Sequence, residues 1–394
     1  MKILVVSQYY YPEPFRITDM CETLVKRGHS VTVVTAQPNY PDGKIYTDYV
    51  NKYQESYING VNIKRSKIYP RGKGAICLFL NYISFPFYAR KIIKKIDKDF
   101  DVVFINQLSP IFSALPGIRY SKKNKIKSIL YCLDLWPESI TSSGISENSF
   151  IYKLIFMIST NIYKRVDRIL VTSKSFIDKF NKIKLNAVYL PQYAEDLFIN
   201  LPCNKKSNEY FVVTFAGNIG EIQSVETILL AAKELLIYED IVINIYGSGS
   251  KFDFIYNLKV SLSLDNVILH GRKAIEEMPL VYSNSDALIV TLKKNKLLSL
   301  TLPGKVQTYM ASGKPIIAAI NGETKNIIEE SKAGYVCNAE DYLQLSKLII
   351  DARSNEYLFQ MGKNGKEYYE KNFTKKVFFE RLEAEFMEVK NVYK

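Results

Sequence analysis

Short apolar runs that recur along the chain, each followed by a loop and a helix-like stretch, constrain the fold most. Two such runs, Lys2–Ser7 and Val31–Thr35, flank a stretch over Thr18–Arg27 in which apolar residues have helical spacing. A nearly continuous apolar run of this length is typical of a strand buried on both faces of a parallel sheet. The opening therefore predicts a β-α-β unit, in which the loop after the first strand is the usual place for a ligand.

The same pattern restarts with the apolar run Phe211–Phe215, after a polar segment over 200–208 that contains Pro202 and lacks periodicity. A length of 394 residues suits two domains of ordinary size, each with its own core. We therefore predict an N-terminal domain over 1–200, a C-terminal domain over 201–374 and a final helix from about 375 to 394.

Cysteine usage and hydropathy bear on the compartment. The five cysteines are scattered, odd in number and without a C-x-x-C pair, which favours a reducing compartment over a disulfide framework or a structural zinc site. The most apolar window, 75–88, is interrupted by Asn81, Ser84 and Pro86 and is too short to cross a membrane. The start resembles a strand rather than a signal peptide, so we expect a cytoplasmic protein.

The positive charge is concentrated in the first half. Residues 1–200 hold 29 Lys and Arg against 16 Asp and Glu, whereas residues 201–394 hold 24 of each, so the whole excess of +13 precedes residue 201. Such a surface suits a membrane leaflet, a lipid diphosphate or nucleic acid, and the absence of a nucleic-acid-binding motif ranks nucleic acid last. Within it, 71–98 mixes cations with apolar residues. This segment reads equally as amphipathic helices on a membrane surface or as domain helices with a solvated basic face.

The stretch 299–315 reads as a loop that enters one short helix. Thr301 and Pro303 are start signals, and Gly313 before a further strand is a stop signal. The first turn holds Gly304 and Lys305, which together offer free N–H groups, a positive dipole end and an ammonium. That combination suits a phosphate, although an ordinary loop–helix passage with a surface lysine has the same spacing.

Several motifs resemble glycosyltransferase family 4, whose members are retaining GT-B enzymes that use nucleotide sugars. The run P-G-K-V-Q-T-Y-M-A-S-G-K-P at 303–315 resembles the donor-site helix of that family. P-E-P-F-R-I, R-G-H-S-V-T-V-V-T and Q-P-N-Y-P-D-G-K-I-Y, within 12–46, are similar to a subgroup that transfers N-acetyl-L-fucosamine in O-antigen and capsule assembly. The resemblance implies an α/β, GT-B fold of two Rossmann-like domains that face each other across a cleft. It also implies that the final helix returns to the first domain.

The resemblance also implies a donor site in the second half. In the loop 216–223, two glycines let the backbone approach a bound group, as they also would in a plain tight turn. Many family members carry Arg and Lys at the positions of Asn218 and Gln223, so Lys305 is left as the leading phosphate cation. Two glutamates of the family are replaced by Leu300 and Thr308. The donor-binding residues implied are Gly217, Asn218, Gln223, Gly247, Arg272, Lys273, Gly304, Lys305, Thr308 and Glu323.

On the acceptor side, Asp134 follows the apolar run 128–133 and is the acid or base we assign to this half, to orient or deprotonate an acceptor hydroxyl. Capping of the following turn is its alternative role. The resemblance places Glu13 and Arg16 beside the acceptor, with a salt bridge as the alternative for Arg16. We interpret His29 and His270 as structural. Asp97 and Asp99 read as turn acids, so we expect no metal.

The resulting hypothesis is a retaining hexosyltransferase with Asp134 and Lys305 as catalytic residues. It would move a sugar, N-acetyl-L-fucosamine by the subgroup resemblance, from a UDP-sugar to a polyprenyl-diphosphate-linked glycan in O-antigen or capsule biosynthesis. The expected location is peripheral, on the inner face of the bacterial cell membrane. A UDP-sugar 2-epimerase of the same fold and a non-enzymatic sugar-binding or membrane-scaffold protein are the alternatives.

Overall fold

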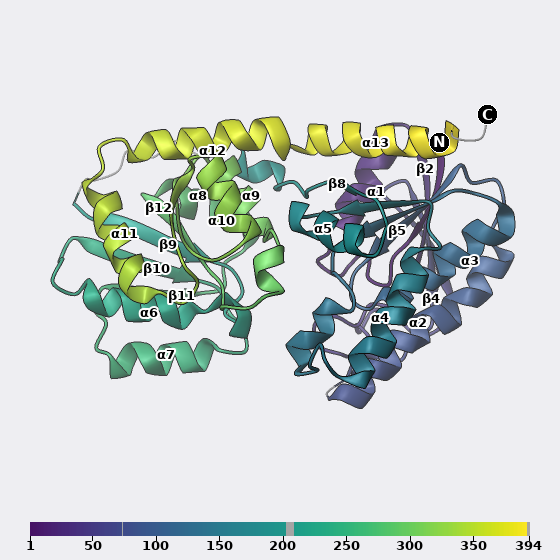
Figure 1. Cartoon of the computed structure of the whole chain (residues 1–394), viewed down its shortest axis with the longest axis horizontal. Coiled ribbons are helices and arrows are strands. Elements are labelled where there is room, and N and C mark those ends of the chain that lie inside the picture. The colour runs from purple at the N-terminus through teal and green to yellow at the C-terminus, as the bar shows by residue number, and fades with distance from the viewer. Residues whose placement is uncertain (73, 202–208, 392–394) are drawn as a thin grey trace. The chain divides into compact units, whose positions relative to one another are not determined.

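The chain forms two compact units (Figure 1). In the computed structural model, the described residues are 1–72, 74–201 and 209–391. Unit 1 comprises Met1–Leu190 and Phe379–Lys394, and unit 2 comprises Pro191–Phe378. The boundary expected after residue 200 lies at Leu190 in the structure. Most of the expected linker, residues 202–208 with Cys203, lies outside the described residues.

Unit 1 is built on an eight-stranded sheet in the order β3-β4-β2-β1-β5-β6-β7-β8, in which only the β3–β4 pair is antiparallel. The strands are β1 (Lys2–Val6), β2 (Ser30–Ala36), β3 (Gln54–Ile58), β4 (Val61–Ser66), β5 (Val102–Gln107), β6 (Ser128–Cys132), β7 (Arg168–Val171) and β8 (Ala187–Tyr189). In the central register, Leu4 of β1 lies between Thr32 of β2 and Val103 of β5. Every residue of β5 is buried, as its apolar sequence predicts for a central parallel strand.

The helices of unit 1 follow from apolar spacing. They are α1 (Ile17–Lys26), α2 (Ala75–Lys95), α3 (Leu115–Asn124), α4 (Phe150–Tyr163) and α5 (Lys174–Lys182), with the 3-10 turns η1 (Ile111–Ala114) and η2 (Glu138–Ser143). Helix α1 buries Met20, Cys21 and Leu24, which share one face, and Gly28 with φ +89° follows its end. The basic and apolar segment 71–98 contains one helix, α2.

The β3–β4 hairpin of unit 1 was not predicted from the sequence. Strands β3 and β4 form a hairpin whose turn residues, Asn59 and Gly60, have φ of 50° and 82°. Asn-Gly is the preferred pair for such a two-residue turn because both positions need positive φ. A side chain on Gly60 would also approach Cγ1 of Val25 to 2.5 Å, so the hairpin packs closely against α1.

Unit 2 contains a six-stranded parallel sheet in the order β11-β10-β9-β12-β13-β14. The strands are β9 (Phe211–Ala216), β10 (Ile241–Tyr246), β11 (Val267–Gly271), β12 (Ala287–Thr291), β13 (Ile316–Ala319) and β14 (Gly334–Cys337). The helices and 3-10 turns are η3 (Asp196–Phe198), η4 (Glu221–Gln223), α6 (Val225–Glu234), α7 (Phe252–Ser261), η5 (Ile275–Glu277), α8 (Met278–Ser283), η6 (Leu298–Leu300), α9 (Gly304–Ala311), α10 (Glu323–Glu330), α11 (Tyr342–Ser354) and α12 (Leu358–Asn372).

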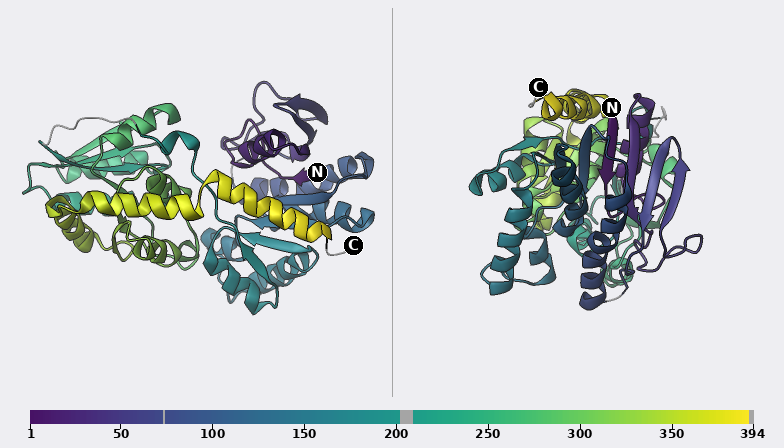
Figure 2. Two further views of the ribbon diagram at one scale, coloured as in Figure 1. Left: turned by 90° about the horizontal axis from the view of Figure 1, so that it is seen from above. Right: turned by 90° about the vertical axis from the view of Figure 1, so that its right-hand side faces the viewer.

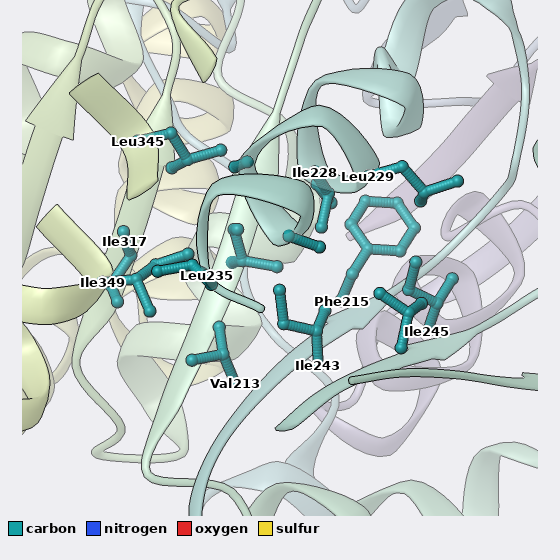
Figure 3. Packing of buried hydrophobic residues seen from close by; sticks show 14 of the residues in the cluster. Val213, Phe215, Ile228, Leu229, Leu235, Ile243, Ile245, Ile317, Leu345 and Ile349 are labelled. Carbon is teal, nitrogen blue, oxygen red and sulfur yellow. The ribbon is translucent and has the colours of Figure 1, made fainter. Parts of the chain in front are cut away.

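The core of unit 2 joins its sheet to α6 and α11. Figure 3 shows Val213, Phe215 and Ile243 of the sheet packed towards Ile228 of α6 and Ile349 of α11. These side chains are fully buried, and each contributes roughly 1.5–3 kcal/mol relative to an exposed position. This core fixes the carboxyl ends of β9 and β10, where the loops of the candidate donor site begin.

The last helix, α13 (Lys375–Asn391), begins in unit 2 and belongs to unit 1 from Phe379 onward. In unit 1, Glu383 accepts hydrogen bonds from Arg27 at 2.7 Å and contacts the His29 ring at 3.0 Å. The other ring nitrogen of His29 lies 3.2 Å from the Met1 amine, which places the N-terminus beside α13 (Figure 2). These contacts give His29 a structural role. That the two domains face each other across a cleft stays a prediction.

A search of the described residues finds no helix that has both the length and the apolar character needed to span a membrane.

Candidate functional site

Helix α9 begins at Gly304, two residues later than a Thr301 cap would place it. Pro303 occupies the N-cap position without a side-chain hydrogen bond, and Thr301 instead donates its hydroxyl to the Leu298 carbonyl at 2.8 Å. The prediction of a Thr301 cap was therefore wrong, whereas the stop signal at Gly313, with φ +68°, was correct. Because no side chain caps the start of α9, its first N–H groups stay available to an external acceptor.

The side chain of Lys305 leaves the first turn of α9 and ends against the loop after β9. Its Nζ lies 4.1 Å from the centroid of the Phe215 ring, and a Cβ built on Gly217 would come within 2.8 Å of it. The Nζ atom is buried and has no hydrogen-bond partner among the described residues. Burial lowers the pKa of Lys305 to about 7. An unpaired ammonium in such a place favours an anion that would restore its charge.

Two glycine loops converge on this lysine. The N–H of Gly217 donates to the Tyr246 carbonyl at 3.0 Å, and that of Ile219 donates to the Ser248 carbonyl at 2.9 Å, so the loops after β9 and β10 are joined. Gly217 and Gly247 both have φ +148°, and a Cβ on Gly247 would lie 1.8 Å from the Gly217 carbonyl oxygen. Glycine is required at Gly247 for this approach and at Gly217 for the space that Lys305 fills.

Tyr309, which the sequence analysis did not assign, holds α9 to β9. Its hydroxyl lies 3.2 Å from the Ala216 nitrogen and 3.3 Å from the Ala216 oxygen, so it both accepts from and donates to that residue. Tyr309 is fully buried. The tyrosine therefore fixes the start of the glycine loop relative to the helix that carries Lys305. Its place inside the motif 303–315 is the sequence signal that could have identified it.

The other predicted donor residues have separate surroundings. Asn218 is exposed and donates to Gln223 at 3.4 Å. Thr308 is buried, and its hydroxyl donates back to the Gly304 carbonyl at 3.2 Å. Lys273 pairs with Glu277 at 2.9 Å, while Arg272 is exposed after β11. The structure thus brings together Gly217, Gly247, Gly304 and Lys305, and the donor contacts of the others stay predictions.

Glu323 is the first residue of α10 and is 4% exposed. The end of α10 that carries it packs against the loop before α9. A Cβ on Gly322 would lie 2.0 Å from the Ser299 oxygen, and Thr324 donates to the Thr301 carbonyl at 3.0 Å. The start of α10 therefore lies next to the segment that leads into α9.

In unit 1, Asp134 follows β6 and joins the loop after β5. Its Oδ2 accepts from the Ser109 N–H at 2.8 Å, and the Trp136 indole donates to the Ser109 hydroxyl at 2.9 Å. Oδ1 of Asp134 has no hydrogen-bond partner within the described part of the chain. The carboxylate is therefore held by one oxygen and free at the other, and it does not cap its own turn.

Arg71 and three tyrosines, which the sequence did not single out, gather near Asp134. The guanidinium of Arg71 lies 5.5 Å from the Tyr40 ring centroid. Burial raises the pKa of both Tyr9 and Tyr82, and the charge of Arg71 partly offsets this rise. The charge of Asp134 adds to the rise in the pKa of Tyr82. The Tyr82 ring packs edge-on against Trp136, with ring centroids 6.4 Å apart. These residues come from separate segments, so only the fold assembles them.

Glu13 has a position that differs from the predicted acceptor contact. It is 3% exposed, and its carboxylate accepts from the N–H groups of Asn39 and Tyr40 at 2.9 Å and of Tyr10 at 3.2 Å. Burial raises its pKa to about 7 despite these bonds. Glu13 therefore supports two loops of unit 1 from inside. Arg16 precedes α1, and its charge partly offsets the rise that burial causes in the pKa of Tyr131 of β6. The contact of Arg16 with a phosphate stays a prediction.

No three His, Cys, Asp or Glu side chains gather as metal ligands within 1–72, 74–201 and 209–391. Asp99 of the D-x-D string pairs with Lys2. His270 stacks on Tyr246, with ring centroids 4.1 Å apart, and contacts Asn244 at 2.7 Å.

Comparisons with known proteins cover both units. Residues 16–188 match the family model described as Glycosyltransferase Family 4, and residues 201–368 match the one described as Glycosyl transferases group 1. The chain is 26% identical over 292 residues to "Probable glycosyltransferase WbjE" of Pseudomonas aeruginosa, covering 70% of this chain and 71% of the relative. It is 24% identical over 346 residues to "Putative colanic acid biosynthesis glycosyl transferase WcaI" of Escherichia coli strain K12, covering 79% and 82%.

Solved structures share the fold over the whole chain. Sucrose-phosphate synthase from Thermosynechococcus elongatus superposes with a TM-score of 0.75 and 16% identity, covering 99% of both chains. Anabaena HepE in complex with UDP and glucose superposes with a TM-score of 0.69 and 14% identity, covering 98% of this chain and 100% of the other. With a parallel-sheet α/β unit in each half and a glycosyltransferase match to each, the chain is a glycosyltransferase of the GT-B fold.

Proposed function

We propose that this glycosyltransferase retains anomeric configuration and moves a sugar from a UDP-sugar to a polyprenyl-diphosphate-linked glycan. The observation that carries the donor half of this proposal is the buried, unpaired ammonium of Lys305 against the glycine loop. A diphosphate supplies the anion that this site lacks and also fits close to a backbone without side chains.

The chemistry follows from where charge develops. As the bond between sugar and phosphate breaks, the leaving diphosphate gains negative charge. Lys305 and the uncapped N–H groups at the start of α9 are fixed beside that charge, so they stabilise the transition state more than the ground state. Because Lys305 sits in apolar surroundings, its interaction with the phosphate is stronger than it would be in water.

The choice of UDP and of a glycan acceptor rests on relatives. Anabaena HepE is described in complex with UDP and glucose, and the E. coli relative is described as acting in colanic acid biosynthesis. N-acetyl-L-fucosamine as the sugar, O-antigen or capsule as the product and the inner membrane face as the location are finer proposals that depend on the motifs within 12–46.

On the acceptor side, we assign Asp134 to the acceptor hydroxyl because one of its oxygens is held by Ser109 while the other is free. In addition to Arg16, we further propose Arg71 as a residue that meets the anionic part of the acceptor. It is half-buried among tyrosines, and it has no carboxylate partner among the described residues. The donor phosphate would take the acceptor proton, with Asp134 assisting.

The test is Lys305→Ala, assayed by UDP release with a lipid-linked acceptor. We expect turnover to fall by more than about tenfold, since one charge-stabilising donor is lost from the reacting centre. Lys294→Ala changes an exposed lysine of the same unit and serves as the matched control. A Lys305→Ala variant that keeps its fold and near-normal turnover would refute the proposal.

Incubating the donor alone separates the other activities. A 2-epimerase converts the UDP-sugar without an acceptor, whereas a transferase at most hydrolyses it slowly. Binding of UDP without any product, whatever the donor and acceptor, would indicate a sugar-binding protein.

A further inference from the structure

Helix α2 exposes a row of large apolar side chains that unit 1 leaves uncovered. Ile76, Phe79, Ile83 and Phe87 are 77%, 58%, 40% and 65% exposed. Their spacing of three and four residues places them on one face of the helix, while Phe85 on the opposite face is fully buried. The row is therefore a continuous apolar face and not a set of scattered surface residues.

Helix α4 carries a second row. Phe150, Leu154 and Met157 share one face at 80%, 42% and 62% exposure, and Ile151 beside them is 56% exposed. In both helices the apolar residues begin in the first turn. An amino end with so many uncovered apolar side chains is costly in water unless something covers it.

The two rows lie on the same part of unit 1. Both helices contact η1, and Figures 1 and 2 show both extending to the same end of the unit. Helix α2 connects β4 to β5 and α4 connects β6 to β7, so both run against the direction of the parallel strands. Their amino ends therefore lie at the carboxyl edge of the sheet, the edge that also carries the Asp134 loop. We call this surface the α2–α4 face.

Positive charge borders the α2–α4 face, and acids are absent from both helices. The apolar row of α2 continues along the same face into Arg90 and Lys94, both exposed, and exposed Lys164 and Arg165 follow the end of α4. Neither helix contains an Asp or Glu. Long basic side chains next to apolar ones suit a surface with an anionic layer above an apolar interior.

We propose that the α2–α4 face docks onto an anionic lipid bilayer, with its apolar side chains among the acyl chains and its cations at the headgroups. A second copy of the chain fits the face less well, because neither helix carries a carboxylate to meet the cations of the other copy. The acid nearest to either amino end along the chain is the exposed Glu147, before α4. The proposal names the surface for the membrane location proposed above, and it rests on that surface and not on the Lys305 site, so either proposal can fail without the other.

The experiment is vesicle flotation of the full chain. Wild type is expected to float with vesicles of equal phosphatidylglycerol and phosphatidylcholine, and to float much less with phosphatidylcholine alone or at high salt. The triple variant Phe79→Ser, Phe87→Ser, Phe150→Ser should lose more than about tenfold in vesicle partitioning, because three aromatic side chains no longer enter the bilayer.

The matched control is Ile237→Ser, Phe254→Ser, Phe359→Ser, which removes three exposed apolar side chains of unit 2 and should float like wild type. Stabilisation by UDP and transfer to a short water-soluble acceptor check that the test variant keeps its fold and chemistry. Retention of these activities with loss of flotation supports the proposal whatever the sugar.

Three results would overturn it: no flotation of wild type on anionic vesicles, equal flotation of the two triple variants, or a wild-type dimer that the test variant converts to a monomer without any vesicle binding. The last result would assign the face to a second copy.

Discussion

At the scale of single residues, Lys305 is a charge that the protein positions without neutralising. Its ammonium lies over the Phe215 ring, a cation–π contact, with no carboxylate or carbonyl partner within the described chain. An attractive ring partly compensates for lost hydration but leaves the full positive charge to an incoming anion. Donor binding should therefore depend on whether this one lysine is protonated.

A pH dependence follows. Burial lowers the pKa of free Lys305 to about 7, and a bound diphosphate raises it again. Above pH 7 the free lysine is largely neutral, so UDP binding must take up a proton and the affinity for UDP should fall as pH rises. We expect calorimetry at about pH 8, in buffers of different ionisation enthalpy, to show an uptake approaching one proton. Lys305→Gln should abolish it.

The same pKa shift has the opposite sign for the stability of the ligand-free protein. Between about pH 7 and the ordinary lysine pKa of 10.5, the unfolded chain holds a proton that folded Lys305 has lost. The contribution of this residue to the free energy of unfolding therefore increases with pH across that window. If wild type and Lys305→Gln take up the same number of protons when they bind UDP, then the lowered pKa does not belong to this lysine.

The role of a residue could be predicted when its signal was local in the sequence, and not when the fold brings its partners together. Lys305 and the glycines stand in short motifs whose family resemblance implied a phosphate, although their spacing alone also fitted an ordinary turn, and the structure brings them together. Tyr82 interacts with the charges of both Arg71 and Asp134 only because segments far apart in the sequence come together in the fold. No local pattern marked Arg71 or Tyr82. The motif of Glu13 identified its loop but not the direction of its side chain, which the structure places inside unit 1, so the acceptor contact stays a prediction.

At the scale of elements, the fit between α9 and the loop after β9 depends on a missing side chain. Gly217→Ala would put a Cβ 2.8 Å from Nζ of Lys305 in a backbone with φ +148°. We expect kcat/KM for the donor to fall by more than about tenfold, since small displacements at a reacting centre have large effects. Steady-state kinetics with varied donor measures this.

Gly28→Ala is the matched control for that variant. Gly28 also has positive φ, +89°, but a Cβ there meets nothing within 4 Å. Both substitutions should cost about 1 kcal/mol of stability from backbone strain, and only Gly217→Ala should impair use of the donor. Equal kinetics for the two would show that the contact with Lys305 is unimportant.

Strands were predictable where burial made them apolar. The apolar runs Lys2–Ser7 and Phe211–Phe215 match β1 and β9 to within one residue, because both strands lie inside a parallel sheet and are largely buried. The edge strand β3 was missed because Gln54, Glu55 and Ser56 give it no apolar run. Its signal was the Asn59-Gly60 turn instead. For β3, turn chemistry is therefore a better predictor than hydropathy.

At the scale of the whole molecule, α13 is one continuous helix whose first residues belong to unit 2 and whose remainder belongs to unit 1. The sequence indicated where this helix begins, but its attachment to unit 1 depends on pairs more than 200 positions apart. Glu383 is the clearest of these, since it meets both Arg27 and His29, and Lys390 meets Asp101 at 2.7 Å. The local spacing of apolar residues cannot predict such pairs.

Glu383→Gln tests how strongly unit 1 holds α13. Arg27 donates to both carboxylate oxygens in a bidentate pair that is partly buried, so we expect the free energy of unfolding to fall by about 1–2 kcal/mol. Glu388→Gln, which removes a more exposed partner of Arg168, should cost at most about 1 kcal/mol. Thermal unfolding with and without UDP measures both variants, and UDP identifies the transition that contains unit 2.

Acid should remove the difference between wild type and Glu383→Gln. The hydrogen bonds and charge of Arg27 lower the pKa of Glu383 below its usual 4.5, so the carboxylate stabilises the fold above that pH. This stabilisation disappears as the pH falls through the lowered pKa, where wild type becomes protonated and resembles the glutamine variant. A difference that persists at low pH, or one no larger than that of Glu388→Gln at neutral pH, would mean that packing such as Phe386 on Phe104, with ring centroids 5.8 Å apart, holds α13 instead.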